Sequence, residues 1–252
     1  MQEKYTTSAV AKIIGIHPNT VRFYEEIGLI TAPLRKENGY RVFTELHIYQ
    51  FKLARIAFEI PVLQNGLREK AINIVKTTAK CDFDAALILK NEYIQQVDSE
   101  IAHSNEAVNI VQELYSNKAL QNTHQLKRKE VSLLLDITMD TLRNWEMNGL
   151  LKIKRKENGY RVYKDEDIQR LKIIRTLKCA NYSLSAILRM LNALDEDCST
   201  NIKDVLNKPR EDEDVISACD KLIDSLNDAK YNAKLIENLL LEMKRKYSNP
   251  PV

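Results

Sequence analysis

The chain has 252 residues, enough for one large or two modest domains, and it is rich in charge but holds six glycines and six prolines. This composition favours a mainly helical protein over a β-sandwich, whose many turns need Gly and Pro. No apolar run approaches a membrane span, the N-terminus lacks the features of a signal peptide, and the cysteines form no CxxC pair. We therefore expect a cytoplasmic protein with reduced thiols and no membrane partner.

The net charge of +3 conceals a segregation along the chain. Residues 1–75 carry 10 basic and 7 acidic side chains, and residues 126–194 carry 15 and 8. The segments that follow them are acidic, with 4 against 7 in residues 76–125 and 9 against 13 in residues 195–252. A basic block is a candidate nucleic-acid footprint, although it is commonly just a solvated face.

The two basic blocks belong to an internal repeat. Residues 10–30, VAKIIGIHPNTVRFYEEIGLI, align with residues 131–151, VSLLLDITMDTLRNWEMNGLL, at an offset of 121. The string RKENGYRV then begins at Arg35 and again at Arg155, at an offset of 120. Self-similarity of this length indicates a duplicated domain.

Each copy predicts the same elements in chain order. A short helix, over residues 8–14 or 129–135, leads through a tight turn into a second helix. Pro18 suits the first position of one second helix, and Thr138 can cap the other. Gly28 and Gly149 suit a left-handed helix end. A hairpin and a third helix follow, so each copy predicts a helix-turn-helix with a wing.

The wing is predicted from an Asn-Gly turn, the strongest short hairpin signal, at residues 38–39 and 158–159. The side chains that flank these turns are Arg35, Lys36, Tyr40 and Arg41 in copy one and Arg155, Lys156, Tyr160 and Arg161 in copy two. Guanidinium and phenol groups suit phosphate oxygens, so such a finger can lie along a nucleic-acid backbone. The alternative is a hairpin charged only for solubility, with its tyrosine packed on the third helix. Two copies, each placed after a helix-turn-helix, favour DNA.

At these residues the chain resembles the MerR family of bacterial transcription regulators. The matching strings are TVRFYEEIGLI with ENGYRVF and TLRNWEMNGLL with ENGYRVY, and the resemblance covers most of residues 5–76 and 126–194. It implies that the second helix enters the major groove of promoter DNA and that the wing holds flanking phosphates. The residues that it assigns to DNA are Arg22, Tyr24 and Arg41 in copy one, and Arg143 and Arg161 in copy two.

The two copies differ where they would meet DNA. Asn144 and Trp145 replace Phe23 and Tyr24, and Trp145 either stacks on a sugar-phosphate edge or sits in the core. The residues at the starts of the second helices, where base edges are read, are His17, Asn19 and Thr20 in copy one and Thr138, Met139 and Asp140 in copy two. Asp140 would repel phosphate or serves only as a local cap. We therefore expect different half-site preferences.

A heptad pattern follows each winged domain. In the second copy it runs through Val215, Cys219, Leu222, Leu226, Ala229, Ala233, Ile236, Leu240, Met243 and Tyr247. In the first it runs through Phe83, Leu87, Lys90, Ile94, Val97, Ile101, Ser104, Val108, Val111 and Tyr115. Each pattern spans roughly 50 Å of helix. Sustained heptads predict a coiled coil, with helices buried in a bundle as the alternative.

These elements predict a mainly α fold of five segments. Winged helix-turn-helix domains cover residues 1–76 and 126–195, coiled-coil helices cover residues 77–116 (stalk one) and 196–252 (stalk two), and residues 117–125 form a linker. The resemblance implies that such stalks pair antiparallel. The linker is too short to return along a stalk, so we expect one chain to be its own dimer, an intramolecular pseudo-dimer. A homodimer with four winged domains is the alternative.

The expected function is sequence-specific DNA binding in transcription regulation. The resemblance implies action on RNA polymerase indirectly, by distorting a promoter whose elements are too far apart. A ligand-sequestering resistance protein that keeps the fold without regulating DNA is the alternative. No phosphate loop, nucleophile elbow or HExxH motif is present, so no enzyme is expected.

No cofactor is expected either. Cys81 and Cys198 precede the stalk helices, but no cysteine pair follows either stalk, and the histidines lack metal-ligand spacing. Cys179 and Cys219 fall on apolar stripes and are expected in the core. A small-molecule effector where the stalks meet the winged domains is possible, but no residue identifies its pocket.

Overall fold

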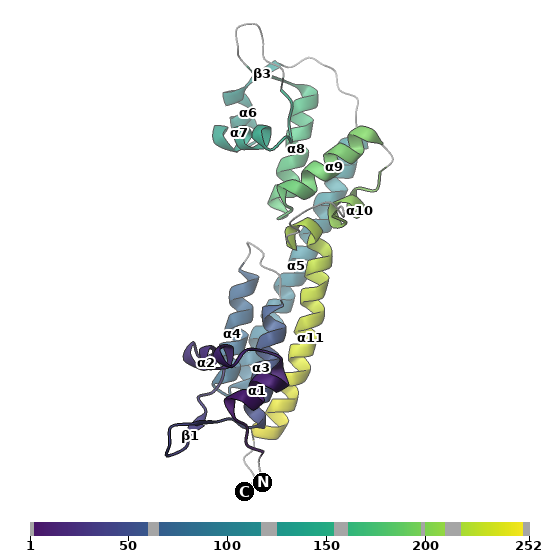
Figure 1. The fold of residues 1–252 in the computed structure, drawn as a ribbon. Helices are drawn as coiled ribbons and strands as arrows, with labels where there is room; N and C mark the ends of the chain where they lie inside the picture. Colours follow the sequence, from purple (N-terminus) through teal and green to yellow (C-terminus); the bar gives the residue numbers. More distant parts are fainter. Residues whose placement is uncertain are drawn as a thin grey trace. The chain divides into compact units, whose positions relative to one another are not determined.

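The computed structural model describes residues 3–59, 66–116, 125–153, 161–197, 200–209 and 218–248. The chain forms two compact units (Figure 1): Met1–Ser99 with Ser225–Val252 make unit 1, and Glu100–Asp224 make unit 2. Each unit contains one of the repeated domains and part of each long stalk helix.

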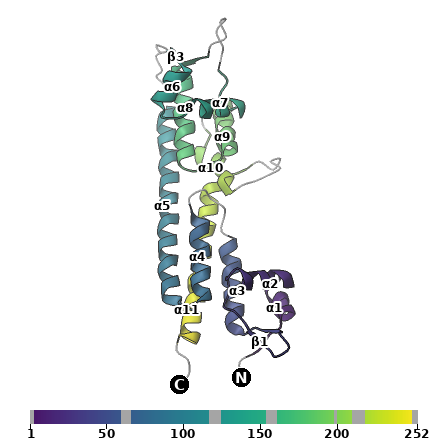
Figure 2. The same cartoon turned by 90° about the vertical axis from the view of Figure 1, so that its left-hand side faces the viewer.

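Unit 1 contains the predicted helix-turn-helix and wing. Its elements are α1 (Thr7–Ile14), α2 (Pro18–Glu26), β1 (Leu34–Arg35), β2 (Arg41–Val42), α3 (Glu45–Phe58) and α4 (Leu67–Ala79). The turn between α1 and α2 depends on Gly15, whose φ of 73° is a left-handed conformation that glycine adopts readily. β1 and β2 are antiparallel, with Leu34 opposite Val42, and an isolated bridge joins Tyr5 to Phe43. Figures 1 and 2 show α1 and α2 packed beside α3.

Aromatic side chains form the core of this domain. Phe43 and Phe51 have no exposed surface, and their ring centroids lie 6.3 Å apart. Tyr24 of α2 stacks on Phe51 at 5.6 Å and meets Phe58 edge-on at 5.8 Å. Truncating one such buried ring typically costs about 3–5 kcal/mol. These rings therefore fix α2 and the wing against α3.

Unit 2 repeats this arrangement and adds to it. Its elements are β3 (Gln125–Lys127), α6 (Arg128–Leu134), α7 (Met139–Met147), β4 (Val162–Lys164), α8 (Asp165–Cys179), α9 (Leu184–Glu196), α10 (Ile202–Asn207) and the 3₁₀ helix η1 (Ala218–Lys221). β3 and β4 are antiparallel, with Leu126 opposite Tyr163. This pair corresponds to Tyr5 and Phe43 of unit 1, which confirms the repeat at the level of backbone pairing.

The first two helices of each copy begin and end close to their predicted bounds, whereas the helices that follow α3 and α8 were not predicted. α4 and α9 occupy residues assigned mainly to the winged domains, and α10 is an addition of copy two. Arg189 of α9 is 7% exposed and donates to the carbonyls of Val205 and Asp220, both at 2.8 Å. Asn207 of α10 accepts the amide of Ile223 at 2.9 Å, so polar contacts fasten α10 to the residues around the start of α11.

The predicted heptad of stalk two is a buried stripe. Its helix is α11 (Leu222–Tyr247), and Val215 lies outside the described residues. Seven predicted positions are at most 1% exposed: Leu222, Leu226, Ala229, Ala233, Ile236, Leu240 and Met243. Heptad spacing alone therefore identified the inner face of this helix.

In stalk one part of the predicted stripe is shifted. Its helix is α5 (Phe83–Ser116), in which six of the ten predicted positions are buried: Phe83, Lys90, Val97, Ser104, Val108 and Val111. Between them, however, Ala86 and Tyr93 have no exposed surface, while the predicted Leu87 and Ile94 are half-buried. Positions three and four residues apart share one helix face, so the spacing did not tell which of them lies innermost.

Three ion pairs join α5 to α11 within unit 1. Lys90 contacts Glu237 at 2.8 Å, Asp98 contacts Lys230 at 2.7 Å, and Asp84 pairs with Lys244. Residue numbers rise along α5 as they fall along α11, so the paired segments run in opposite directions. Lys90 is 2% exposed, and its ion pair is the most buried of the three.

The C-terminal end of each stalk helix contacts a winged domain. In unit 1, Lys246 of α11 lies 3.1 Å from the Glu45 carboxylate and donates to the Tyr49 hydroxyl at 2.7 Å. Tyr247 also donates to Glu45, and burial raises its pKa to about 12. In unit 2, Tyr115 of α5 donates to the carbonyl of Leu194 at 3.0 Å. The end of α11 is thus fixed to domain one, and the end of α5 to domain two.

The free cysteines depart from expectation at one position. Cys179 is exposed at the end of α8 rather than buried, and Cys219 is half-buried in η1. Among the described residues, no His, Cys, Asp and Glu side chains gather in threes as metal donors would. Cys198 lies outside those residues.

Candidate nucleic-acid interface

The second helix of copy one separates a buried face from an exposed one. The His17 ring nitrogen Nδ1 accepts the Asn19 amide at 3.1 Å and caps the helix ahead of Pro18. Val21 and Tyr24, three residues apart, are 0% and 6% exposed and point into the core. The opposite face therefore presents polar side chains to solvent.

Two of these polar side chains are oriented by one hydrogen bond. Arg22 is exposed, and its Nη1 donates to the Asn19 side-chain oxygen at 2.9 Å. Neighbouring Phe23 is 52% exposed, and Thr20 is half-buried. A guanidinium held along an exposed helix face retains donors for a phosphate or a guanine edge.

The second helix of copy two is built in the same way with other side chains. The Thr138 hydroxyl accepts the Thr141 amide at 3.0 Å, which confirms its predicted capping role. Leu142 is fully buried, and Arg143 and Asn144 are exposed. Asp140 is exposed in the first turn, where a carboxylate favours the helix dipole.

Tyr24, which the resemblance assigns to DNA, and Trp145, for which the core was one of two alternatives, both lie in the core. Tyr24 is 6% exposed and Trp145, its counterpart in α7, is 5% exposed. Their inward-facing neighbours Val21 and Leu142 show that this face of each helix packs on the domain. Burial leaves both rings little surface for a nucleic acid, so we assign Tyr24 and Trp145 a packing role.

The wing of copy one turns at the predicted residues. Gly39 has a φ of 78°, the Lys36 amide donates to the Tyr40 carbonyl at 2.9 Å, and the Asn38 side chain accepts the Tyr40 amide at 3.3 Å. Tyr40 is 72% exposed and does not pack on α3. Lys36 is exposed as well. The tip of this wing therefore offers an ammonium and a phenol to solvent.

The wing arginines are engaged by a carboxylate of the second helix. Glu25 of α2 accepts Arg35 at 3.2 Å and also pairs with Arg41, whose side chain is 25% exposed. In copy two, Arg161 lies 2.6 Å from Glu146 of α7, and Tyr163 donates to the same carboxylate at 2.8 Å. These pairs fasten each wing to its helix, so the arginines have a structural role beside any phosphate contact.

The remaining wing residues of copy two, Arg155, Lys156 and Tyr160, lie outside the described residues. Sequence reasoning missed the two carboxylates, Glu25 and Glu146. They occupy equivalent positions of the repeat, 16 and 15 residues before Arg41 and Arg161. This recurrence was a readable signal, because paired charges at matching positions in both copies suggest one shared contact.

Fold and surface together define a protein with two winged helix-turn-helix domains, each with a capped second helix and, where the structure describes it, an arginine-bearing wing. Comparison with known families agrees. Residues 6–43 match the MerR family regulatory proteins, and residues 126–194 match the MerR HTH family regulatory proteins.

Individual relatives support the same assignment. The mercuric resistance operon regulatory protein of Bacillus cereus is 32% identical over 95 residues, 37% of this chain and 71% of that protein. The HTH-type transcriptional regulator CueR of Yersinia pestis is 37% identical over 91 residues, 35% of this chain and 65% of that protein. The chain therefore belongs to the MerR family, and it carries two MerR-type domains.

The likeness to other relatives is shorter. CueR of Escherichia coli is 49% identical over 53 residues, which cover 21% of this chain and 39% of that protein. The chain thus spans about two fifths of the length of such relatives. No solved structure matches the chain significantly. None of the helices in the described segments combines the length and the apolar character of a membrane span.

Proposed function

We propose that this chain is a sequence-specific DNA-binding transcription regulator of the MerR type in which one polypeptide supplies both winged domains. The observation that carries the proposal is the pair of MerR-type domains, each presenting an exposed arginine on the outer face of its second helix. Arg22 and Arg143 occupy equivalent positions of α2 and α7. A helix face of this kind fits the major groove, where arginine reads guanine and phosphate.

The proposed architecture is an intramolecular pseudo-dimer with antiparallel stalks. Two observations support it: the three ion pairs between α5 and α11 run in opposite chain directions, and each stalk's C-terminal end contacts the winged domain of the other copy. An antiparallel coiled coil creates both features. Covalent linkage would then supply the second domain at a high effective concentration.

The two half-sites are proposed to differ. His17, Asn19 and Thr20 stand where copy two has Thr138, Asp140 and Thr141. Amide and imidazole groups read base edges differently from a carboxylate. Family likeness further suggests that the protein distorts its promoter and so acts on RNA polymerase without contacting it, a mechanism that uses the deformability of the DNA between the half-sites.

The direct test is selection of bound duplexes from a random library, followed by mobility shifts at increasing salt. We expect one asymmetric operator and a steep loss of affinity with salt, since each neutralised phosphate contributes about one unit of slope. A protein that binds no duplex above background at low salt would instead be a sequestering protein of the same fold, and the proposal would be abandoned.

A further inference from the structure

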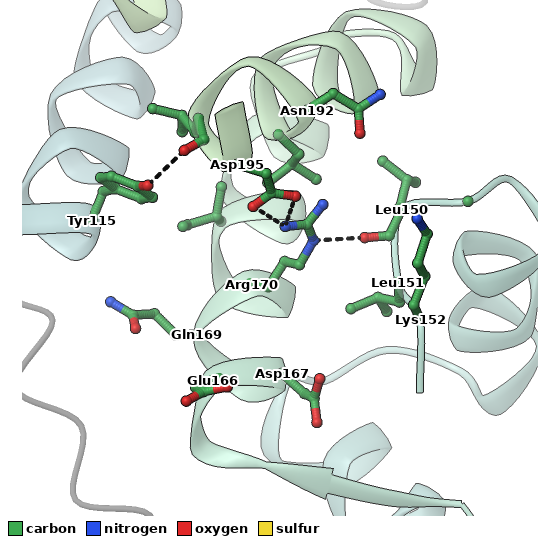
Figure 3. A pocket seen from close by; sticks show the side chains of 14 residues that line it. Tyr115, Leu150, Leu151, Lys152, Glu166, Asp167, Gln169, Arg170, Asn192 and Asp195 are labelled. Atoms are coloured by element: carbon green, nitrogen blue, oxygen red, sulfur yellow. Dashed lines mark hydrogen bonds and ion pairs between the residues drawn. The ribbon is translucent and has the colours of Figure 1, made fainter. Parts of the chain in front are cut away.

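Unit 2 contains a cavity of about 540 Å³ beside its second helix. It is lined by residues 149–152 after α7, by Tyr115 of α5, by five residues of α8 between Glu166 and Ile173, and by four residues of α9 between Leu191 and Asp195. Figure 3 shows Arg170 at its centre, between Leu150 and Asp195. A volume of this size suits a small organic molecule.

One terminal nitrogen of the central arginine has no hydrogen-bond partner among the described residues. Its Nε donates to the Leu150 carbonyl at 2.9 Å, and its Nη1 lies 3.1 and 3.0 Å from the two oxygens of Asp195. Within the described residues these contacts involve Nε and Nη1 but not Nη2, and Lys152, which also lines the cavity, is exposed. In a bidentate pair a carboxylate can accept from both terminal nitrogens of a guanidinium, whereas Asp195 contacts only Nη1.

The equivalent place in unit 1 is closed and neutral. There Gln50 stands for Arg170 and Thr78 for Asp195, and both are 1% exposed. The Gln50 amide donates to the Thr31 hydroxyl at 2.9 Å and to the Thr78 carbonyl at 3.1 Å, and accepts the Thr31 amide at 2.9 Å. A neutral amide thus suffices to fasten these elements together.

Copy two performs the same fastening with charges that face solvent. The side chains of Arg170 and Asp195 are 27% and 59% exposed. Because the Asp195 carboxylate is exposed to water, this pair contributes less to stability than a buried one, and the neutral amide of copy one already holds the same elements together. The charges and the open cavity beside them therefore point to a ligand.

We propose that this cavity binds a small apolar monocarboxylate, whose anionic group sits on Nη2 of Arg170 and the ammonium of Lys152. Leu151, Ile173 and Leu191 supply an apolar wall for its body. Glu166 and Asp167 line the far end of the cavity on α8 and disfavour a second negative charge there. A monoanion therefore fits better than a polyphosphate.

The ligand would act on the DNA-facing helix, a consequence that rests on the proposed function. Arg170 ties the segment that leaves α7, at Leu150, to the end of α9, at Asp195. A ligand carboxylate on Nη2 repels the Asp195 carboxylate on Nη1, because both anions then share the charge of one guanidinium. Binding would loosen the tie to α9 while Arg170 keeps its bond to Leu150, and so change how firmly α7 is held.

Calorimetric titration of the full chain with benzoate tests the site, with benzyl alcohol and benzylammonium as neutral and cationic controls of the same shape. We expect one saturable benzoate site per chain and no comparable binding of the two controls. Asp195→Asn removes the carboxylate that repels the ligand and should tighten benzoate binding at least threefold. The matched variant Arg170→Gln with Asp195→Thr installs the residues of copy one, so it should fold and bind benzoate at least tenfold more weakly.

Several results would overturn the inference: no benzoate binding at millimolar concentration, equal binding of benzyl alcohol, or unchanged binding in both variants. Preference for benzylammonium would show that the carboxylates, not Arg170, select the ligand. A mobility shift on the same preparations separates the two proposals. A chain that binds DNA but not benzoate retains the proposed function and loses this site.

Discussion

The buried ion pair between the stalks gives a prediction whose size follows from its surroundings. The Lys90 side chain is 3% exposed, and that of Glu237, 2.8 Å away, is 38% exposed. Removing one partner of a fully buried pair costs about 3–5 kcal/mol, and an exposed pair is worth about 0–1 kcal/mol. Glu237→Gln would leave the Lys90 ammonium buried without a charged partner. Because water reaches Glu237, we expect this substitution to lower the free energy of unfolding by an intermediate amount, about 1.5–3 kcal/mol.

The reverse substitution should behave differently. Lys90→Leu installs the residue that stalk two carries at the matching heptad position, Leu222, and leaves an accessible carboxylate behind. We expect its stability to lie within about 1 kcal/mol of wild type or above it, and the double variant to resemble Lys90→Leu alone. Urea unfolding followed by circular dichroism measures all three variants. Equal losses in both single variants, or none in Glu237→Gln, would refute the buried pairing of α5 with α11.

Three further predictions concern the DNA surface and the core. Arg22→Ala should reduce the salt slope of DNA binding by about one unit, whereas Arg41→Ala should reduce it by less, because a helix carboxylate already neutralises that arginine; equal slopes in mobility shifts would contradict this. Burial lowers the pKa of the His47 imidazole below its usual value of 6.5. The free energy of unfolding is therefore highest above pH 6.5 and decreases as the pH falls below it, because the unfolded chain takes up the proton more readily. His47→Gln should remove this decrease in urea unfolding measured between pH 7.5 and 5. Exchanging His17–Thr20 for the Thr138–Thr141 sequence should convert an asymmetric selected operator into one with two similar halves, and an unchanged operator would show that these positions read no bases.

Local signals predicted the repeated elements well. The helix boundaries are set by residues that act on the backbone next to them in the sequence: Pro18, Thr138 and the two Gly residues after the second helices. Their effects can therefore be predicted from the sequence alone. The heptad of α11 was readable for the same reason. The inner stripe of α5 was predicted only in part, because Ala86 and Tyr93 are buried by the elements that pack on the helix, which the heptad pattern does not record.

The exposed side chains of the candidate interface could be predicted from the sequence, whereas the contacts that these elements make with one another were not predicted. Exposed Arg22 and Arg143 follow from helix periodicity, since Val21 and Leu142 beside them point inward. Tyr24 was assigned to DNA and Trp145 was left between two alternatives because an amphipathic ring on a helix can face solvent or the core, and the periodicity alone does not tell which. The carboxylates that hold the wings lie 15 or 16 residues before their arginines, so only their recurrence in both copies, and no local pattern, could have indicated these contacts.

The central claim is that one chain brings two winged domains to one operator. Light scattering coupled to chromatography at micromolar concentration, with and without a selected duplex, tests it most directly. The pseudo-dimer predicts a particle of 29.1 kDa that binds one asymmetric duplex with a stoichiometry of one chain per duplex. A stable particle of twice that mass, with two chains on each duplex, would contradict the account.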